Sequence, residues 1–198
     1  MTLVFATNNE NKVKEIRAML GDSFSVITLQ EAGINIDIPE PHQTLEENAR
    51  EKSTVIFEMT GKDCFSEDTG LEIDALNGAP GVLSARYAGE QKRSEDNINK
   101  VLQELDGQQN RKAHFRTVIS LILGGQEFQF TGVCPGTITT ERRGGDGFGY
   151  DPIFIPDGSD IAFAEMDIAG KNKFSHRAKA LQQLITFLRE EGKKSLSL

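Results

Sequence analysis

The residues best suited to chemistry are two neighbouring acids, Glu67 and Asp68, which follow a short apolar run. We expect Cys64–Ser66 to form a buried strand that ends at residues 67–70, and ligands bind beyond the carboxyl ends of strands in α/β sheets. Side chains alternate along a strand, so the two acids should point in different directions. A carboxylate there can hold Mg²⁺ or orient a water molecule, and Glu40, between two prolines, could supply a second oxygen ligand. A polar turn without a ligand is the alternative interpretation.

Groups that could bind an anion lie near both ends of the chain. A polar turn follows the apolar run 3–6 and precedes a helical pattern, and the N–H groups at a helix N-terminus attract phosphate oxygens. Lys12 adds a positive charge to this turn, while Lys171, His176 and Arg177 gather donors at the start of the last expected helix. An ordinary helix cap with solvated charges is the alternative for both segments. The turn consists of Thr7, Asn8, Asn9, Glu10 and Asn11.

A glycine-rich loop at residues 142–149 carries an aromatic side chain, Phe148, near its end. Glycines allow the backbone to approach a ligand closely, and an aromatic ring can stack on a nucleobase. A flexible turn before the next strand is the alternative interpretation. Carboxylates for a metal, scattered cations and an aromatic ring are together a plausible set for hydrolysing a nucleoside triphosphate.

Helices and strands that alternate early in the chain, with a hairpin in the middle, must position these groups. Buried strands appear as continuous apolar runs, and helices as apolar residues three and four apart. The pattern is typical of an α/β fold with a mixed sheet. Thr44 and Glu47 form a capping box for the second helix. The expected strands are 3–6, 24–29, 64–66, 115–123, 127–133, 137–140 and 154–155, and the expected helices are 13–20, 45–59, 95–105 and 175–190.

Composition indicates an ordinary globular chain. Its 198 residues include 30 acidic and 22 basic side chains, with a net charge of -8, which disfavours a non-specific DNA or RNA binder because that function needs a basic surface. The length fits a single domain spanning 1–198. No apolar run approaches the roughly 18 residues of a membrane span. Cys64 and Cys134 both lie in apolar segments and are expected as buried free thiols of a cytoplasmic protein.

Six short segments occur in the same order as the motifs of one known family. They are Thr7–Lys12, which matches (S/T)xNxxK, Glu47–Ser53, which matches ENAxxKA, Ser66–Leu71, which matches (A/S)(D/E)D(S/T)GL, Gly78–Tyr87, which matches GxPGxxSARY, Phe148–Pro152, and Ser175–Arg177. Over nearly its full length the chain thus resembles the inosine/xanthosine triphosphate pyrophosphatases, which remove deaminated purine nucleotides. Two positions depart from the usual pattern, because Ser53 stands where alanine is usual and Glu67 where aspartate is more common.

This resemblance implies a fold, an assembly and a reaction. The fold would be an elongated mixed β-sheet flanked by helices, in two lobes with a central cleft, and the protein would be a homodimer. The reaction would cleave the purine nucleoside triphosphates ITP, dITP or XTP between the α- and β-phosphates, giving the monophosphate and pyrophosphate. Neither a nucleic acid nor a membrane would be a partner.

The resemblance also implies a role for each candidate residue. Glu40 and Asp68 would hold Mg²⁺, and Asp68 would also accept a proton. The phosphates would be bound by Thr7, Asn8, Asn9, Glu10, Asn11, Lys12, Lys52 and Thr69. The base would be enclosed by Phe148, Gly149, Tyr150, Asp151, Lys171, His176 and Arg177. Donors such as His176 and Arg177 would pair with the 6-carbonyl of hypoxanthine or xanthine and be left unpaired by adenine.

Two other functions stay open at this point. One is an enzyme of similar fold that acts on pyrimidine or methylated nucleotides, which a panel of substrates would distinguish. The other is a nucleotide sensor without catalysis, which would bind its ligand tightly and release it unchanged. The acids Glu40 and Asp68 argue against the sensor, because binding alone does not need a metal-activated water.

Overall fold

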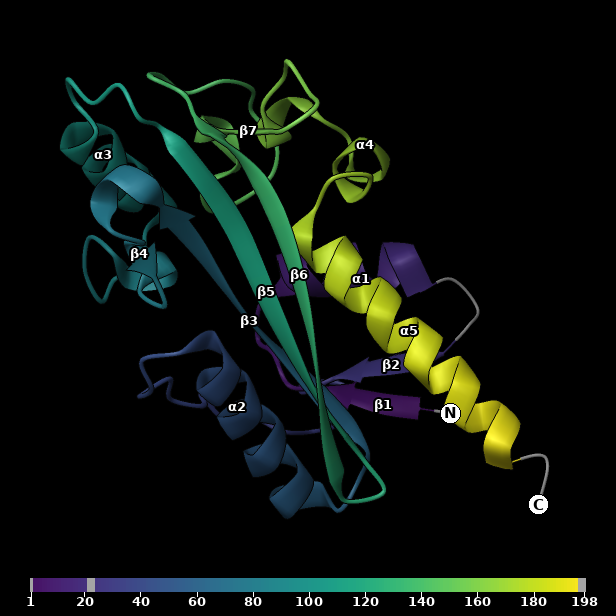
Figure 1. Ribbon diagram of the computed structural model, residues 1–198. Helices are drawn as coiled ribbons and strands as arrows, with labels where there is room; N and C mark the ends of the chain where they lie inside the picture. Colours follow the sequence, from purple (N-terminus) through teal and green to yellow (C-terminus); the bar gives the residue numbers. More distant parts are fainter. Residues whose placement is uncertain (1, 21–23, 196–198) are drawn as a thin grey trace. The chain divides into compact units, whose positions relative to one another are not determined.

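A computed structural model of the chain (Figure 1) describes residues 2–20 and 24–195. The helices are α1 (Glu10–Leu20), α2 (Leu45–Thr60), α3 (Ser94–Glu104), α4 (Ile168–Asn172) and α5 (His176–Ser195). The strands are β1 (Thr2–Phe5), β2 (Ser25–Thr28), β3 (Cys64–Ile73), β4 (Pro80–Gly81), β5 (Lys112–Leu123), β6 (Gln126–Ile138) and β7 (Phe154–Pro156). Within the described ranges, no helix is long and apolar enough to cross a membrane.

The strands form one mixed sheet in the order β2-β1-β3-β5-β6-β7, with β4 paired to β3. Strand β1 runs parallel to β2 and to β3, whereas β4 is antiparallel to β3 and β7 is antiparallel to β6. Strands β5 and β6 are joined by Gly124 and Gly125, both at positive φ, as the predicted hairpin requires. The mixed α/β fold predicted from the sequence is therefore confirmed.

The chain divides into two compact units. Unit 1 comprises residues 1–68, 117–132 and 177–198, and unit 2 comprises residues 69–116 and 133–176. Strands β3, β5 and β6 each contribute residues to both units. The two units agree with the expectation of two lobes, while the single domain and the central cleft stay predictions.

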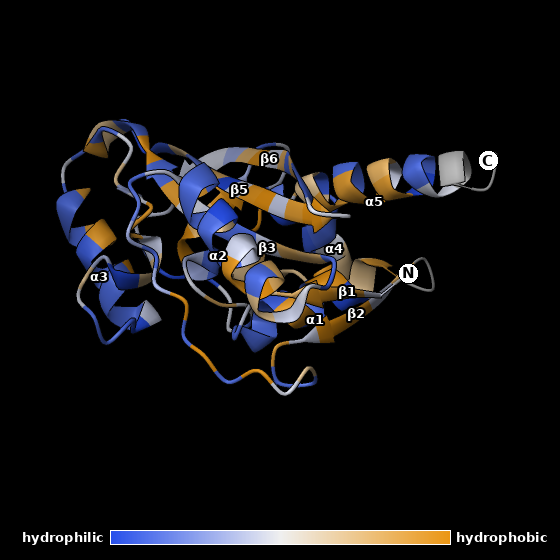
Figure 2. Ribbon diagram, turned by 90° about the horizontal axis from the view of Figure 1, so that it is seen from below, coloured by the Kyte–Doolittle hydropathy of each residue, from blue (hydrophilic) through white to orange (hydrophobic). Residues whose placement is uncertain are grey.

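In unit 1, alternating side chains of β1 and β3 face different helices. Phe5 and Phe65 stack with their ring centroids 4.5 Å apart and share a core with apolar side chains of α1 and α5. Val4 and Cys64, each one position away, instead pack with Ile56 of α2. Figure 2 shows β1 and β5 mostly hydrophobic, while α2 and α5 alternate between hydrophilic and hydrophobic residues. This is the pattern expected of helices that bury one side against a sheet.

Unit 2 has a core of its own. Leu71 and Ile73, at the end of β3, pack with Ile98 and Val101 of α3. The ring of Phe115 lies edge-on to that of Phe154, with centroids 4.7 Å apart, and 6.2 Å from that of Phe163. The cores of the two units are thus built from different segments of the same strands.

Two strand boundaries predicted from the sequence were wrong. Strand β3 does not end at residues 67–70 but runs on to Ile73. Leu71 and Ile73 are buried in the core of unit 2, and the two acids within the strand have cationic partners. The separate strand expected at 137–140 is instead the end of β6. The cap of α2 is confirmed, since the Thr44 hydroxyl accepts a hydrogen bond from the Glu47 amide at 3.2 Å. The helix stop expected at Gly21 lies outside the described residues.

Candidate active site

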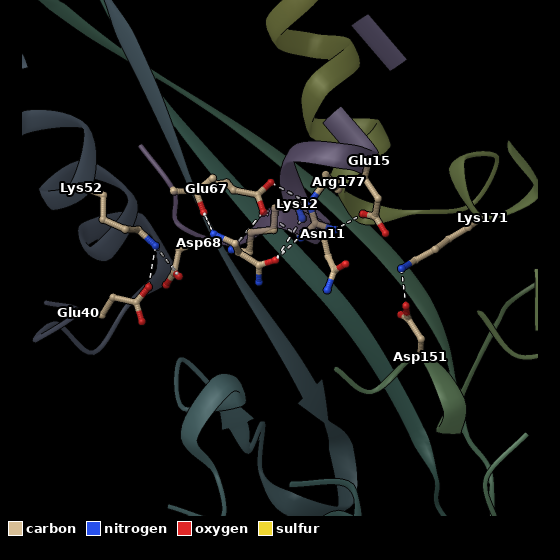
Figure 3. Close-up of polar contacts among 12 residues, drawn as sticks. Asn11, Lys12, Glu15, Glu40, Lys52, Glu67, Asp68, Asp151, Lys171 and Arg177 are labelled. Carbon is tan, nitrogen blue, oxygen red and sulfur yellow. Dashed lines mark hydrogen bonds and ion pairs between the residues drawn. The ribbon is translucent and has the colours of Figure 1, made fainter. Parts of the chain in front are cut away.

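Strand β3 directs its two acids to different partners, as Figure 3 shows. Asp68 pairs with Lys52 of α2, whereas Glu67 pairs with Lys12 of α1 and Arg177 of α5. The prediction that the two acids point in different directions is confirmed, and the cause is the two-residue repeat of the strand. The expectation that the two acids lie at the end of the strand is wrong, because β3 continues for five residues beyond Asp68.

The first cluster contains two carboxylates and one ammonium group. Lys52 Nζ lies 2.8 Å from Glu40 Oε1 and 3.0 Å from Asp68 Oδ1. Burial and the charge of Glu40 raise the pKa of Asp68 despite the opposing effect of Lys52. The pKa of Glu40 is lowered, because the positive charges of Lys52 and Lys12 outweigh its burial. Burial opposes protonation of Lys52, but the two carboxylates prevail and raise its pKa.

Helix α2 is aligned along β3 by side-chain hydrogen bonds to its backbone. Ser66 Oγ donates to the carbonyl oxygen of Ala49, and Cys64 Sγ donates to that of Ser53 at 3.2 Å. Both donors lie on the same side of β3 as Asp68, two and four residues before it. These bonds hold α2 against β3, and Lys52 of α2 is therefore held opposite Asp68 of β3.

The second cluster is an ion-pair network around Arg177, whose side chain is 2% exposed. Its Nε donates to both Glu67 oxygens at 2.9 Å, and its Nη1 donates to Glu15 Oε2 at 2.5 Å. Lys12 Nζ lies 3.1 Å from Glu67 Oε1. Burial opposes ionisation of Glu67, but the charges of Arg177 and Lys12 lower its pKa to about 2. The pKa of Arg177 is raised because the charges of Glu67 and Glu15 outweigh its burial.

The polar turn before α1 is built as a helix cap. Asn9 Oδ1 accepts hydrogen bonds from the amides of Asn11 at 3.0 Å and Lys12 at 3.2 Å. Asn8 Nδ2 donates to the carbonyl oxygen of Ile36 at 2.8 Å, and Thr7 Oγ1 accepts from the Asn9 amide at 3.2 Å. The alternative interpretation of this segment as a helix cap therefore describes its structure, and its role in phosphate binding stays a prediction.

Unit 2 contains a third, smaller cluster in which a buried ion pair meets aromatic rings. Lys171 Nζ lies 2.6 Å from Asp151 Oδ2 and 4.9 Å and 5.3 Å from the ring centroids of Phe148 and Phe163. The Phe148 amide donates to the same Asp151 oxygen at 3.0 Å. The Tyr150 hydroxyl donates to the carbonyl oxygen of Ser84 at 2.9 Å. Part of the predicted base-binding set is thus gathered around one carboxylate.

The remaining predicted residues divide between the units. His176 is buried in unit 2, where its ring stacks on Phe115 with centroids 4.6 Å apart. Thr69 also belongs to unit 2, although it follows Asp68 directly. Arg177 was expected beside His176 at the base, and the structure places its guanidinium among the unit 1 carboxylates. Sequence reasoning missed Glu15, whose only signal is its place one helical turn after Lys12.

The first cluster fits a magnesium ion. Among residues 2–20 and 24–195 no group of three or more His, Cys, Asp or Glu side chains is arranged to hold a metal. Glu40 and Asp68 nevertheless converge on one positive charge, the Lys52 ammonium group. Mg²⁺ is usually bound by one or two carboxylates and completes its shell with water and substrate phosphates. The donor set therefore suits a magnesium ion held jointly with a phosphorylated ligand.

Comparison with known proteins identifies relatives over nearly the whole chain. The dITP/XTP pyrophosphatase of Flavobacterium johnsoniae is 51% identical over 188 residues, which cover 95% of this chain and 98% of the relative. The dITP/XTP pyrophosphatase of Porphyromonas gingivalis is 49% identical over 187 residues, covering 94% and 96%. The solved structure of the Staphylococcus aureus Ham1 protein is 38% identical, with a TM-score of 0.87 and coverage of 96% and 100%.

A family model agrees with these relatives. The model of the Ham1 family matches residues 3–187. The resemblance stated from the six sequence segments is thus confirmed by independent comparisons of sequence and structure. The chain belongs to the Ham1 family.

Proposed function

We propose that this protein hydrolyses deaminated purine nucleoside triphosphates, namely ITP, dITP and XTP, to the monophosphate and pyrophosphate in a reaction that depends on Mg²⁺. The substrate class is supported by two relatives, 51% and 49% identical, that are named dITP/XTP pyrophosphatases. The observation that carries the proposal is the convergence of Glu40 and Asp68 on Lys52 Nζ at 2.8 Å and 3.0 Å. Two carboxylates facing one ammonium leave one negative charge, which suits an added cation.

The phosphate chemistry is assigned to unit 1. A bound Mg²⁺ would polarise a phosphoryl oxygen or lower the pKa of a water molecule. Glu40 and Asp68 would hold the ion, and the Asp68 carboxylate would take the proton of the attacking water. Lys12 and Lys52 would offset the charge of the triphosphate. Phosphoryl transfer depends mostly on positioning and electrostatics, so the protein needs no covalent nucleophile.

Recognition of the base is assigned to unit 2. The Lys171 ammonium, held by Asp151 at 2.6 Å, is a donor suited to the 6-carbonyl oxygen of hypoxanthine or xanthine. The ring of Phe148 could stack on the base. Adenine presents an amino group at position 6 and would set a second donor against this ammonium group, which is the kind of mismatch that binding sites reject strongly. The expected role of Arg177 at the base stays part of this proposal.

The experiment is a panel of nucleoside triphosphates with Mg²⁺, in which pyrophosphate and orthophosphate are assayed separately. We expect ITP, dITP and XTP to be hydrolysed far faster than ATP, with pyrophosphate as the first product. ATP turnover as fast as that of ITP, or orthophosphate as the first product, would contradict the proposal. Preferential turnover of pyrimidine or methylated nucleotides would support the rival enzyme, and tight binding without turnover would support the sensor.

Assembly and location belong to the same proposal. The protein is proposed to be a cytoplasmic homodimer, and its two cysteines, buried and free, agree with a reducing compartment. Light scattering coupled to size-exclusion chromatography measures the molar mass directly. A mass of one chain across the concentrations used for activity would contradict the homodimer.

A further inference from the structure

Asn48 of α2 has a buried side chain that forms hydrogen bonds to the backbone of the segment before the helix. It is 0% exposed. Its Oδ1 accepts a hydrogen bond from the His42 amide at 2.9 Å, and its Nδ2 donates to the His42 carbonyl oxygen at 3.2 Å. The amide therefore pairs with both polar groups of one residue, as a neighbouring strand would.

The residue held in this way lies two positions after Glu40. Pro39 and Pro41 flank Glu40 and each fixes its own φ, so few backbone rotations separate the carboxylate from the anchored residue. Residues 34–43 contain neither helix nor strand, and they need side-chain contacts of this kind to hold a defined position.

Asn48 also stands one helical turn before Lys52. Residues four apart share a face of a helix, so the same face of α2 anchors the segment of Glu40 and presents the ammonium group that Glu40 meets at 2.8 Å. Thr44 caps the beginning of this helix, which fixes the turn between the segment and Asn48. The geometry of the carboxylate pair is thus built on a single helix.

We propose that Asn48 is a positioning residue that sets the Glu40 carboxylate opposite Asp68 for binding of a divalent cation. This inference rests on the proposed function, because it takes Glu40 and Asp68 as the ligands. Groups that orient metal ligands from behind typically change metal affinity by about 10- to 100-fold when they are removed. Asn48 acts through His42 and the prolines, and does not itself contact the cation.

Unit 2 offers a matched control in Asn97 of α3. It is 4% exposed, its Oδ1 accepts from the Ala88 amide at 2.7 Å, and its Nδ2 donates to the Ala85 carbonyl oxygen at 3.0 Å. Asn97 therefore fixes a loop in the same manner, without a metal ligand in that loop. Loss of either asparagine removes two hydrogen bonds to the backbone of the neighbouring segment and should lower the melting temperature.

The test is binding of Mn²⁺ to the full chain without nucleotide, measured by electron paramagnetic resonance, with Mg²⁺ as competitor. We expect Asn48→Ala to weaken binding about 10-fold, and Asn97→Ala to leave binding unchanged despite a lower melting temperature. In the Glu40→Gln background, Asn48→Ala should have no further effect, because the ligand that it positions is already lost. If Asn48 had a merely structural role, Asn48→Ala would weaken Mn²⁺ binding by the same factor in the wild-type protein and in the Glu40→Gln variant.

The outcomes separate the inference from the proposal on which it rests. If Glu40→Gln or Asp68→Asn leaves Mn²⁺ binding unchanged, the metal assignment itself is wrong. If Glu40→Gln weakens binding but Asn48→Ala does not, the metal assignment stands and the positioning role is wrong. Asn48→Ser, which keeps a short polar group, replaces the alanine variant if that variant does not unfold cooperatively, with the same expectations.

Discussion

The charged clusters of the two units differ in how their charges balance. In unit 2, Lys171 and Asp151 form an ion pair beside the rings of Phe148 and Phe163. In unit 1, Arg177 and Lys12 form ion pairs with Glu15 and Glu67, whereas Lys52 forms ion pairs with the two carboxylates of Glu40 and Asp68. Unit 1 thus contains both a balanced network and an unbalanced one.

This difference indicates what each cluster can do. Burying a charge costs free energy unless an opposite charge compensates it. The balanced network around Arg177 can be complete without a ligand, while the carboxylate pair at Lys52 gains from an added cation. The neutral pair of unit 2 is suited to an uncharged ligand such as a nucleobase.

The largest effect is expected for Arg177→Met. Methionine has a similar length but no charge, so Glu15 and Glu67 would both stay buried without their main partner. Removing one member of a buried ion pair costs about 3–5 kcal/mol, and we expect at least this loss in the free energy of unfolding measured with urea. Lys171→Met leaves only one carboxylate uncompensated and should cost less. An equal or larger loss for Lys171→Met would contradict the comparison.

Each unit contains one buried cysteine, Cys64 in unit 1 and Cys134 in unit 2. The rate at which each thiol is labelled therefore shows which unit is destabilised by Arg177→Met. Burial, with the nearby charge of Asp63, raises the pKa of the Cys64 thiol to about 12, so at pH 8 it should react with a thiol reagent only when unit 1 opens. Cys134 is 2% exposed in unit 2. Arg177→Met should accelerate labelling of Cys64 more than that of Cys134. In the folded variant, the ratio of ITP to ATP turnover also tests the expected contact of Arg177 with the base.

The second effect is expected for Asp68→Asn, which keeps the size of the side chain and removes its charge. Loss of a metal ligand that also accepts the proton should lower ITP turnover by about 10²-fold or more. Folding should survive, because the raised pKa of Asp68 means that its ionised form costs the folded state free energy near neutral pH. Steady-state hydrolysis at saturating Mg²⁺ and thermal unfolding without metal measure the two effects. Near-normal turnover would remove Asp68 from the mechanism, and a collapsed melting temperature would make it structural.

The sequence predicted those features of the site that depend on local patterns. The alternation of Glu67 and Asp68 follows from the two-residue repeat of any strand, and the Thr44 cap follows from a short motif at the start of α2. The order of six segments identified the family, because their spacing is kept along the chain.

What the sequence could not reveal depends on partners far apart in the chain. Glu15 and Arg177 are 162 positions apart, so no local pattern indicates that they meet. For the same reason β3 was predicted to end at its acids: a strand can continue through Glu67 and Asp68 only because distant cations compensate them. The role of Asn48 depends likewise on the path of the segment before α2, which has no repeating pattern to predict.

The smallest effect is expected in unit 2, for Gly147→Ala. Gly147 has φ +84, and a Cβ there would lie 2.4 Å from Asp151 Oδ2, the oxygen that accepts from the Phe148 amide and pairs with Lys171. The alanine should displace this carboxylate and its lysine, and lower kcat/KM for ITP about 10-fold while changing that for ATP little. Gly145→Ala is the control for an added methyl group in the same loop, because a Cβ at Gly145 meets nothing within 4 Å. Mn²⁺ binding should be unchanged in both variants, since the carboxylates of unit 1 are untouched. An ITP preference that survives Gly147→Ala would mean that the pair of unit 2 does not select the base.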